Sequence, residues 1–229
     1  MSALQAIIFD FDGVIADSEP LHLRAFQQVL AGEGIALTRH DYFSRYLGFD
    51  DVGMFEAIAR DRSVPMTDRQ IASLVAQKGV KLQELMRADS VLFPGARDFV
   101  REAAAAVPVA IASGALRHEI DEIVEAAGIA DCFSAIVASG DTPESKPSPA
   151  PYLLAFHRLC TTTGRSLEPR RCVAIEDSRW GLDSARGAGL RCVGVTNSYP
   201  ADELPGAELI TSGLSRLTLK ALHTLCENP

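Results

Sequence analysis

The sequence predicts an α/β fold in which a parallel β-sheet is covered by helices on both faces. Short apolar runs typical of buried strands recur along the chain, and segments with helical spacing of apolar residues lie between most of them. Strands that alternate with helices form parallel sheets that are buried on both faces. One long segment without a convincing strand predicts a second, purely helical domain.

Five apolar runs are predicted to be strands, and four segments between or after them are predicted to be helical. The strands are residues 6–9, 107–112, 135–138, 172–175 and 191–195. The helices include residues 102–106, 116–127, 150–160 and 178–188. Gly189 directly follows the last of these, as is typical of a helix end.

The segment from about residue 18 to residue 88 has only helical patterns. These cover residues 21–31, 41–47, 52–60 and 68–86, with glycines and a proline between them. We therefore expect a helical cap domain at 17–91, inserted into a sheet domain formed by 1–16 and 92–229. An insertion directly after the first strand is expected to act as a lid.

The composition is that of a folded globular protein. The 229 residues are 47% hydrophobic and 23% charged, with a net charge of −8 and few clusters of basic residues, so neither nucleic acid nor a membrane is expected as the main partner. No window is long enough to cross a bilayer. The five cysteines are widely spaced and form no CxxC pair, which favours reduced thiols and a cytoplasmic protein.

The first predicted strand ends in two acids, Asp10 and Asp12, followed by Gly13. Side chains alternate along a strand, so the two acids are expected to point the same way, roughly 7 Å apart. Such a pair is repulsive unless a cation lies between the acids or one of them is protonated. A solvated strand end is the alternative interpretation of the pair alone.

Polar residues also follow two other predicted strands. Ser113 follows the second strand, and Glu176 and Asp177 follow the fourth. In open parallel sheets ligands bind beyond the carboxyl ends of the strands, where the acidic pair also lies. This convergence predicts one active site at that edge.

Four motifs in this order resemble the haloacid dehalogenase (HAD) superfamily. They are Asp10-Phe11-Asp12-Gly13-Val14, Ser113, Lys146-Pro147-Ser148-Pro149 and Glu176-Asp177-Ser178. The helical insertion resembles the α-helical cap (C1 type) of the subgroup that includes phosphoglycolate phosphatases and β-phosphoglucomutase. The resemblance implies a Rossmann-like core with helices on both faces of the sheet.

The resemblance implies roles for the core residues. Asp10 is the expected nucleophile, forming an aspartyl phosphate, and Asp12 the expected general acid and base. Ser113, Gly114 and Lys146 are expected to bind the phosphoryl group. A second set of residues is expected to hold Mg²⁺: Asp10, the backbone carbonyl of Asp12, Asp177 directly, and Glu176 directly or through a water.

Candidates for substrate contact in the cap are Ser18, His22, Arg45, Gly48 and Lys78, although a structural histidine and solvated surface cations are the alternative interpretations. β-Phosphoglucomutase-like caps carry a lysine just before the cap glycine and an arginine three residues after it. Leu47 and Asp51 occupy those positions here. An acid at a distal phosphate site is repulsive, which disfavours mutase activity.

The sequence thus predicts a Mg²⁺-dependent phosphatase acting on a small phosphorylated metabolite, as a monomer or small homo-oligomer. A β-phosphoglucomutase-type phosphomutase is the first alternative. A phosphate-binding or signalling protein without catalysis is the second.

Overall fold

The structure, a computed structural model, describes residues 4–46, 49–88 and 91–227. The chain divides into two compact units. One comprises Met1–Asp17 and Val91–Pro229, and the other comprises Ser18–Ser90. The first unit contains the sheet, and the helices of the second form a hydrophobic core of their own.

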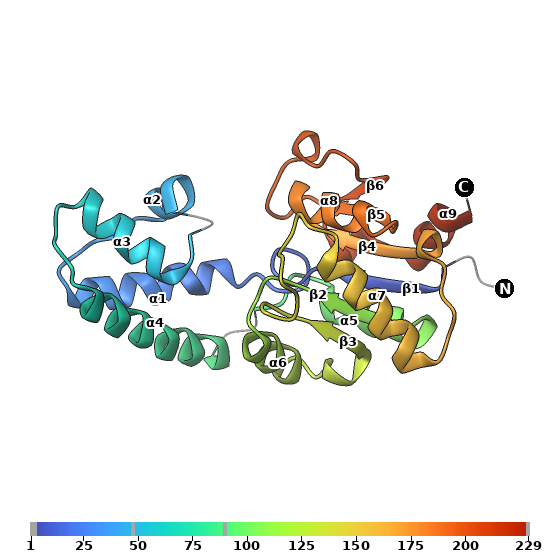
Figure 1. Cartoon of the computed structure of the whole chain (residues 1–229), viewed down its shortest axis with the longest axis horizontal. Helices are drawn as coiled ribbons and strands as arrows, with labels where there is room; N and C mark the ends of the chain where they lie inside the picture. The colour runs from blue at the N-terminus through green and yellow to red at the C-terminus, as the bar shows by residue number, and fades with distance from the viewer. Residues whose placement is uncertain (1–3, 47–48, 89–90, 228–229) are drawn as a thin grey trace. The chain divides into compact units, whose positions relative to one another are not determined.

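The sheet has six strands in the order β3-β2-β1-β4-β5-β6, and every neighbouring pair is parallel (Figure 1). The strands are β1 (Ala6–Phe9), β2 (Val109–Ala112), β3 (Phe133–Val137), β4 (Cys172–Glu176), β5 (Arg191–Val195) and β6 (Leu209–Thr211). This confirms the predicted α/β class.

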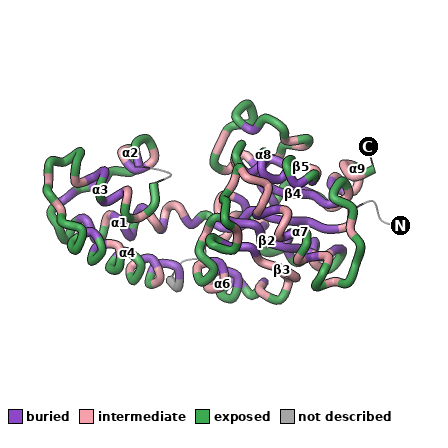
Figure 2. Tube along the Cα trace, viewed as in Figure 1, coloured by how far each residue is buried: buried purple, intermediate pink, exposed green. Residues whose placement is uncertain are grey.

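Helices cover both faces of the sheet. They are α5 (Ala96–Ala106), α6 (Arg117–Ala126), α7 (Ala150–Thr163), α8 (Arg179–Gly187) and α9 (Leu219–Glu227). On one face Ile8 belongs to a buried cluster with Tyr152 of α7 and Leu182 of α8. On the other face Phe9 packs edge-on against Phe99 of α5, with ring centroids 6.2 Å apart. Neighbouring residues of β1 point to opposite faces of the sheet, and both faces are buried, so the strand is apolar throughout. Figure 2 shows the central strands as buried.

The strand ends differ slightly from the prediction. β2 begins at Val109 rather than at residue 107, since Pro108 has no N–H to give to a ladder. The sequence patterns missed β6 and α9. Strand β6 has three residues at the edge of the sheet, none of them buried, so it lacks the apolar run that marked the other strands.

The inserted unit is entirely helical among its described residues. Its elements are α1 (Glu19–Gly32), α2 (Arg39–Asp41), the π-helical turn η1 (Tyr42–Tyr46), α3 (Asp51–Asp61) and α4 (Asp68–Ala88). Where one helix was predicted at 41–47, the chain forms α2 and then η1, and residue 47 lies outside the described part.

The insertion leaves and rejoins the sheet unit at one point. The N–H of Asp17 donates to the carbonyl of Val91 at 2.7 Å, and Ala16 forms a bridge with Leu92. The two ends of the insertion are therefore anchored to each other within the sheet unit.

No described helix is both long enough and apolar enough to cross a membrane. All five cysteines are free, and Cys172 and Cys192 are buried, which confirms the interpretation of these two as buried thiols.

Candidate active site

The strand register brings the predicted site residues to one edge of the sheet. Phe9 of β1 pairs with Ile111 of β2 and with Ile175 of β4. Asp10 and Ser113 directly follow β1 and β2, and Glu176 is the last residue of β4, so all three lie at the same edge. The N–H of Asp10 donates to the carbonyl of Ile175 at 2.9 Å and extends the ladder by one bond.

Three buried carboxylates lie together there. Oxygens of Asp10, Glu176 and Asp177 lie within 4.8 Å of one another. Burial, and then the neighbouring Glu176 charge, raise the pKa of Asp10 well above its usual value. The same two causes raise the pKa of Asp177 to about 6. The positive charge around the three carboxylates is therefore too small to keep these pKa values at their usual level.

Lys146 supplies part of that charge. Its Nζ lies 2.6 Å from Asp10 Oδ1 and 2.6 Å from Glu176 Oε1. Burial alone would lower the pKa of Lys146, but the two carboxylates outweigh it and raise the pKa above its usual value. The lysine is therefore a permanent ammonium that links the expected nucleophile to Glu176.

Glu176 is fully buried, and both of its carboxylate oxygens have hydrogen-bond donors. Oε1 accepts from Lys146 and, at 2.8 Å, from the Tyr152 hydroxyl. Oε2 accepts from the Asp177 N–H at 3.2 Å and from the Ser178 hydroxyl at 3.3 Å. A Cβ at Gly181 would lie 1.9 Å from the Glu176 carboxylate carbon, so only glycine leaves room for this side chain.

Asp177 is held by the turn after β1 and by the loop after β5. The backbone of Gly13 has a φ of +81°, and a Cβ there would lie 1.8 Å from Asp177 Oδ2. The Ser198 hydroxyl donates to the same oxygen. Asn197 Nδ2 donates to the Gly13 carbonyl at 2.7 Å, so the loop fixes both the acid and the turn beneath it.

The second member of the acidic pair lies beyond the strand. β1 ends at Phe9, and Asp12 lies in a turn in which the N–H groups of Val14, Ile15 and Ala16 all approach the Phe11 carbonyl. The residue is half-buried, and its carboxylate does not belong to the group of three clustered acids. The strand alternation that predicted a shared direction stops before this residue, so that direction stays a prediction.

The predicted phosphate-binding residues lie at the end of β2. Ser113 is buried, and its Oγ accepts from the Ala115 N–H at 3.0 Å. Gly114 is exposed, and a Cβ there would meet nothing within 4 Å. The turn is therefore open at Gly114. An anion-binding site made of backbone N–H groups requires such open space.

The donor set fits a hard divalent cation. Three carboxylates face one another with a single ammonium between two of them. Burial, and then repulsion from Glu176, raise the pKa values of Asp10 and Asp177, and a cation would offset both effects. Carboxylate oxygens are the ligands that Mg²⁺ prefers.

Two of the candidates in the helical unit lie together. Lys78 of α4 is buried, with its Nζ 2.8 Å from Asp51 Oδ1 and 3.0 Å from His22 Nδ1. The ammonium also lies 4.9 Å from the centroid of the Phe26 ring. Burial, and then the Lys78 charge, lower the pKa of His22 to about 3, so the imidazole is neutral. Lys78 is thus an interior ion-pair partner and not a solvated surface cation.

The other described cap candidates, Arg45 and Ser18, have different side-chain surroundings. Arg45 is exposed and pairs with Asp61 at 2.6 Å. Ser18 is buried at the start of α1, where its carbonyl accepts from the N–H of Leu21 and of His22. Gly48 lies outside the described residues.

Three contacts at the site escaped the sequence analysis: those of Tyr152, Asn197 and Ser198. Asn197 and Ser198 follow β5, so the rule that ligands lie beyond strand ends gave a signal for them. Tyr152 lies within the helix predicted at 150–160, and only the fold brings its hydroxyl to Glu176. Trp180, two residues after Ser178, is exposed and rests edge-on against Tyr199.

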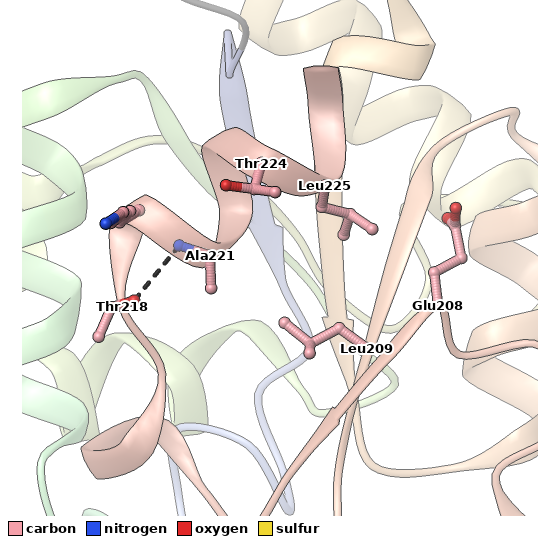
Figure 3. A pocket seen from close by; sticks show the side chains of 7 residues that line it. Glu208, Leu209, Thr218, Ala221, Thr224 and Leu225 are labelled. Carbon is pink, nitrogen blue, oxygen red and sulfur yellow. Dashed lines mark hydrogen bonds between the residues drawn. The ribbon is translucent and has the colours of Figure 1, made fainter. Parts of the chain in front are cut away.

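A cavity of about 430 Å³ lies elsewhere on the sheet unit, between β6 and α9 (Figure 3). It is lined by Glu208, Leu209, Thr218, Lys220, Ala221, Thr224 and Leu225. None of these residues belongs to the acidic cluster. The candidate active site is therefore the other location, where the charged groups converge.

Comparison with known proteins finds relatives along most of the chain. Protein CbbY of Rhodobacter capsulatus is 33% identical over 97% of this chain and 99% of its own. Hexitol phosphatase B of Escherichia coli is 31% identical over 95% of this chain and 96% of its own. A crystal structure of a mutant CbbY from Rhodobacter sphaeroides, in complex with xylulose-(1,5)bisphosphate, superposes with a TM-score of 0.77 at 30% identity and covers 93% of this chain and 96% of that one.

The family model described as haloacid dehalogenase-like hydrolase matches residues 4–189, which include all four motifs. Together with the phosphatase relatives, this match confirms the predicted family and the predicted class of enzyme. The chain belongs to the haloacid dehalogenase-like hydrolases.

Proposed function

We propose that this protein is a Mg²⁺-dependent phosphatase that hydrolyses a small phosphate monoester through an aspartyl phosphate on Asp10. The observation that carries the proposal is the placement of the Lys146 ammonium, 2.6 Å from Asp10 and 2.6 Å from Glu176, beside the third acid. A carboxylate nucleophile and an anionic phosphoryl group repel each other. A fixed ammonium at the nucleophile reduces that repulsion.

Asp10 attacks phosphorus, and the bond from phosphorus to the leaving oxygen breaks. The lysine holds Asp10 Oδ1 in place for this step, since a nucleophile with one fixed orientation loses less entropy on reaching the transition state. The product is an acyl phosphate, which water opens in a second displacement.

Asp12 moves the proton in both displacements. It gives a proton to the leaving alcohol in the first and takes one from the attacking water in the second. The half-buried position of Asp12 in the turn after β1, two residues from the nucleophile, supports this role.

Ser113 and the turn at Gly114 hold the phosphoryl oxygens together with Lys146. The support is their position at the edge where Asp10 emerges, given by the pairing of Phe9 with Ile111. When bound, Mg²⁺ would neutralise charge on the nucleophile and the phosphoryl group. The residues that would hold it are Asp10, the carbonyl of Asp12, Asp177, and Glu176 directly or through a water.

The substrate is a small phosphorylated metabolite of the sugar phosphate or phosphoglycolate type. Relatives named hexitol phosphatase and phosphoglycolate phosphatase support this class, as does the sugar bisphosphate bound to the CbbY structure. Residues 17–91 would form the cap that selects the substrate, with Ser18, His22, Arg45, Gly48 and Lys78 as candidate contacts.

A phosphomutase of the β-phosphoglucomutase type is the alternative. The argument from Asp51 against a second phosphate site is weaker than the sequence suggested, because Asp51 is paired with Lys78. The structural neighbours that carry this name are 21% and 22% identical, and likeness at that level supports a shared fold alone. We therefore favour hydrolysis.

The test is phosphate release with Mg²⁺ from phosphoglycolate, hexose phosphates, pentose phosphates and xylulose bisphosphate, by the parent protein and by Asp10→Asn. Conversion of β-glucose 1-phosphate in the presence of its bisphosphate is measured alongside. Metal-dependent release that is lost in Asp10→Asn supports the phosphatase. Isomerisation without net release would favour the mutase, and a folded, Mg²⁺-loaded protein without either activity would favour a binding role.

A further inference from the structure

Tyr152 contacts both members of the ion pair at the site. The residue lies in the first turn of α7, six residues after Lys146, and is fully buried. Its hydroxyl donates to Glu176 Oε1 at 2.8 Å, and the Lys146 Nζ lies 5.1 Å from the centroid of its ring. One side chain therefore touches the carboxylate through its hydroxyl and the ammonium through its ring.

The two contacts have different physical origins. The hydroxyl donates a hydrogen bond to a buried charge, a contact that is stronger than one between neutral groups. The ring presents its negative face to the ammonium, which is attractive where water is excluded. The hydroxyl contact depends on a single oxygen atom, so it can be removed while the ring and the packing of α7 remain.

We propose that Tyr152 is a positioning residue for the reaction: its hydroxyl fixes the Glu176 carboxylate, and through it the Lys146 ammonium, in the orientation that Asp10 needs. This inference rests on the proposed phosphatase function and deepens it. A residue that only fills the core would tolerate phenylalanine. A residue that orients the charged groups would not.

The test compares the parent with Tyr152→Phe after circular dichroism has shown that both are folded. Loss of a hydrogen bond behind a catalytic or metal-binding group lowers activity or metal affinity about 10–100-fold. We expect kcat to fall by that factor, while KM changes less than about threefold because the substrate's own contacts remain. Calorimetric titration with Mg²⁺ in the absence of substrate is expected to give affinity weakened by about tenfold.

Tyr42→Phe is the matched control. Tyr42 is a buried tyrosine whose hydroxyl donates to a glutamate, Glu19, in the helical unit. The kcat and the Mg²⁺ affinity of Tyr42→Phe are expected to equal those of the parent. A comparable loss in this control would show that any buried tyrosine-to-carboxylate bond has the effect, which would overturn the proposal.

A double substitution tests whether Tyr152 acts through Glu176. In a Glu176→Gln background the neutral amide no longer fixes Lys146 by charge. Adding Tyr152→Phe should then lower kcat by less than about threefold, because groups that act together are not additive. An undiminished effect in this background would contradict the proposed route.

Failure of the inference differs from failure of the proposed function. If the parent releases phosphate and Tyr152→Phe keeps both its kcat and its Mg²⁺ affinity, the positioning role is overturned and the phosphatase stands. If the parent acts on no ester, the phosphatase fails, and the Mg²⁺ titration alone then decides on Tyr152. Weakened binding in that titration supports the role, and unchanged binding overturns it.

Discussion

Asp177 Oδ2 occupies the place where residue 13 would carry a Cβ, 1.8 Å from the position of that atom. The positive φ of Gly13 and this contact make two separate demands for glycine at one position. Because the acid and the turn are fixed against each other, a change in either moves the other.

Gly13→Ala is expected to lower Mg²⁺-dependent activity about 10–100-fold, because the new methyl group displaces a carboxylate of the proposed metal site. Gly140→Ala is the control. Gly140 has a φ of +86° and nothing within 4 Å of a Cβ, so it shares the backbone strain without the clash. Activity and chemical denaturation of both variants are compared. Equal loss of activity in the two would attribute the effect to backbone strain alone.

Lys146→Met keeps most of the length of the side chain and removes its charge. We expect kcat to fall by about 10²–10³, the usual cost of one group that stabilises transition-state charge. The variant is also expected to lose about 3–5 kcal/mol of unfolding free energy, because the buried carboxylates of Asp10 and Glu176 lose their ammonium. Urea denaturation measures this.

Lys81→Met serves as the comparison for Lys146→Met, since Lys81 pairs with Glu84 at the surface. A surface pair contributes about 0–1 kcal/mol, so little change is expected. If both lysine variants behave alike, Lys146 has no special place in the site.

Mg²⁺ is expected to raise the thermal midpoint of the parent. A ligand at about 100 times its dissociation constant stabilises the native state by about 2.7 kcal/mol. Asp177→Asn should remove most of this gain. Since the pKa of Asp177 is raised to about 6, the carboxylate loses protons as the pH rises from 5 to 7, and the Mg²⁺-dependent shift should grow over that range. A shift independent of pH would argue against Asp177 as a ligand.

The neutral His22 predicts a pH dependence of stability. Its pKa is about 3 in the folded protein and about 6.5 in the unfolded chain, so the unfolded chain binds the proton first as the pH falls. His22 therefore contributes stability above pH 6.5 and loses it progressively toward pH 3, with a slope of at most about 1.4 kcal/mol per pH unit.

Denaturation at pH 5 and pH 7 measures this contribution. His22→Gln should show a smaller fall in stability toward acid pH than the parent. His118→Gln, at an exposed histidine, should match the parent. A parent and a His22→Gln protein with identical pH profiles would refute the neutral, buried state.

The sequence predicted the central strands well because each is an apolar run buried on both faces. β1 and β5 have the predicted ends, since continuous burial leaves a clear pattern. The edge strand β6 has no such pattern. Register then followed from topology: once β1, β2 and β4 are neighbours, Asp10, Ser113 and Glu176 must share an edge.

The partners of the charged groups could not be predicted in the same way. Lys78 and Asp51 are 27 residues apart, and Tyr152 and Glu176 are 24 residues apart. Neither pair has a local pattern, because each depends on where folded helices meet other elements. A lysine that looked like surface thus proved to be buried, and a residue of a predicted helix proved to carry a hydroxyl to the site.

The hydrogen bond between Asp17 and Val91 has a consequence for the evolution of this chain. For the folding of the sheet unit, the helical insertion is equivalent to a loop whose two ends are hydrogen-bonded to each other. Loop length adds little to the entropy of closure, so the sheet folds much the same whatever the loop contains. A different insertion with its own core could therefore be grafted between these two residues. Under the proposed function, this would change which metabolite is recognised and leave the phosphoryl chemistry as it is.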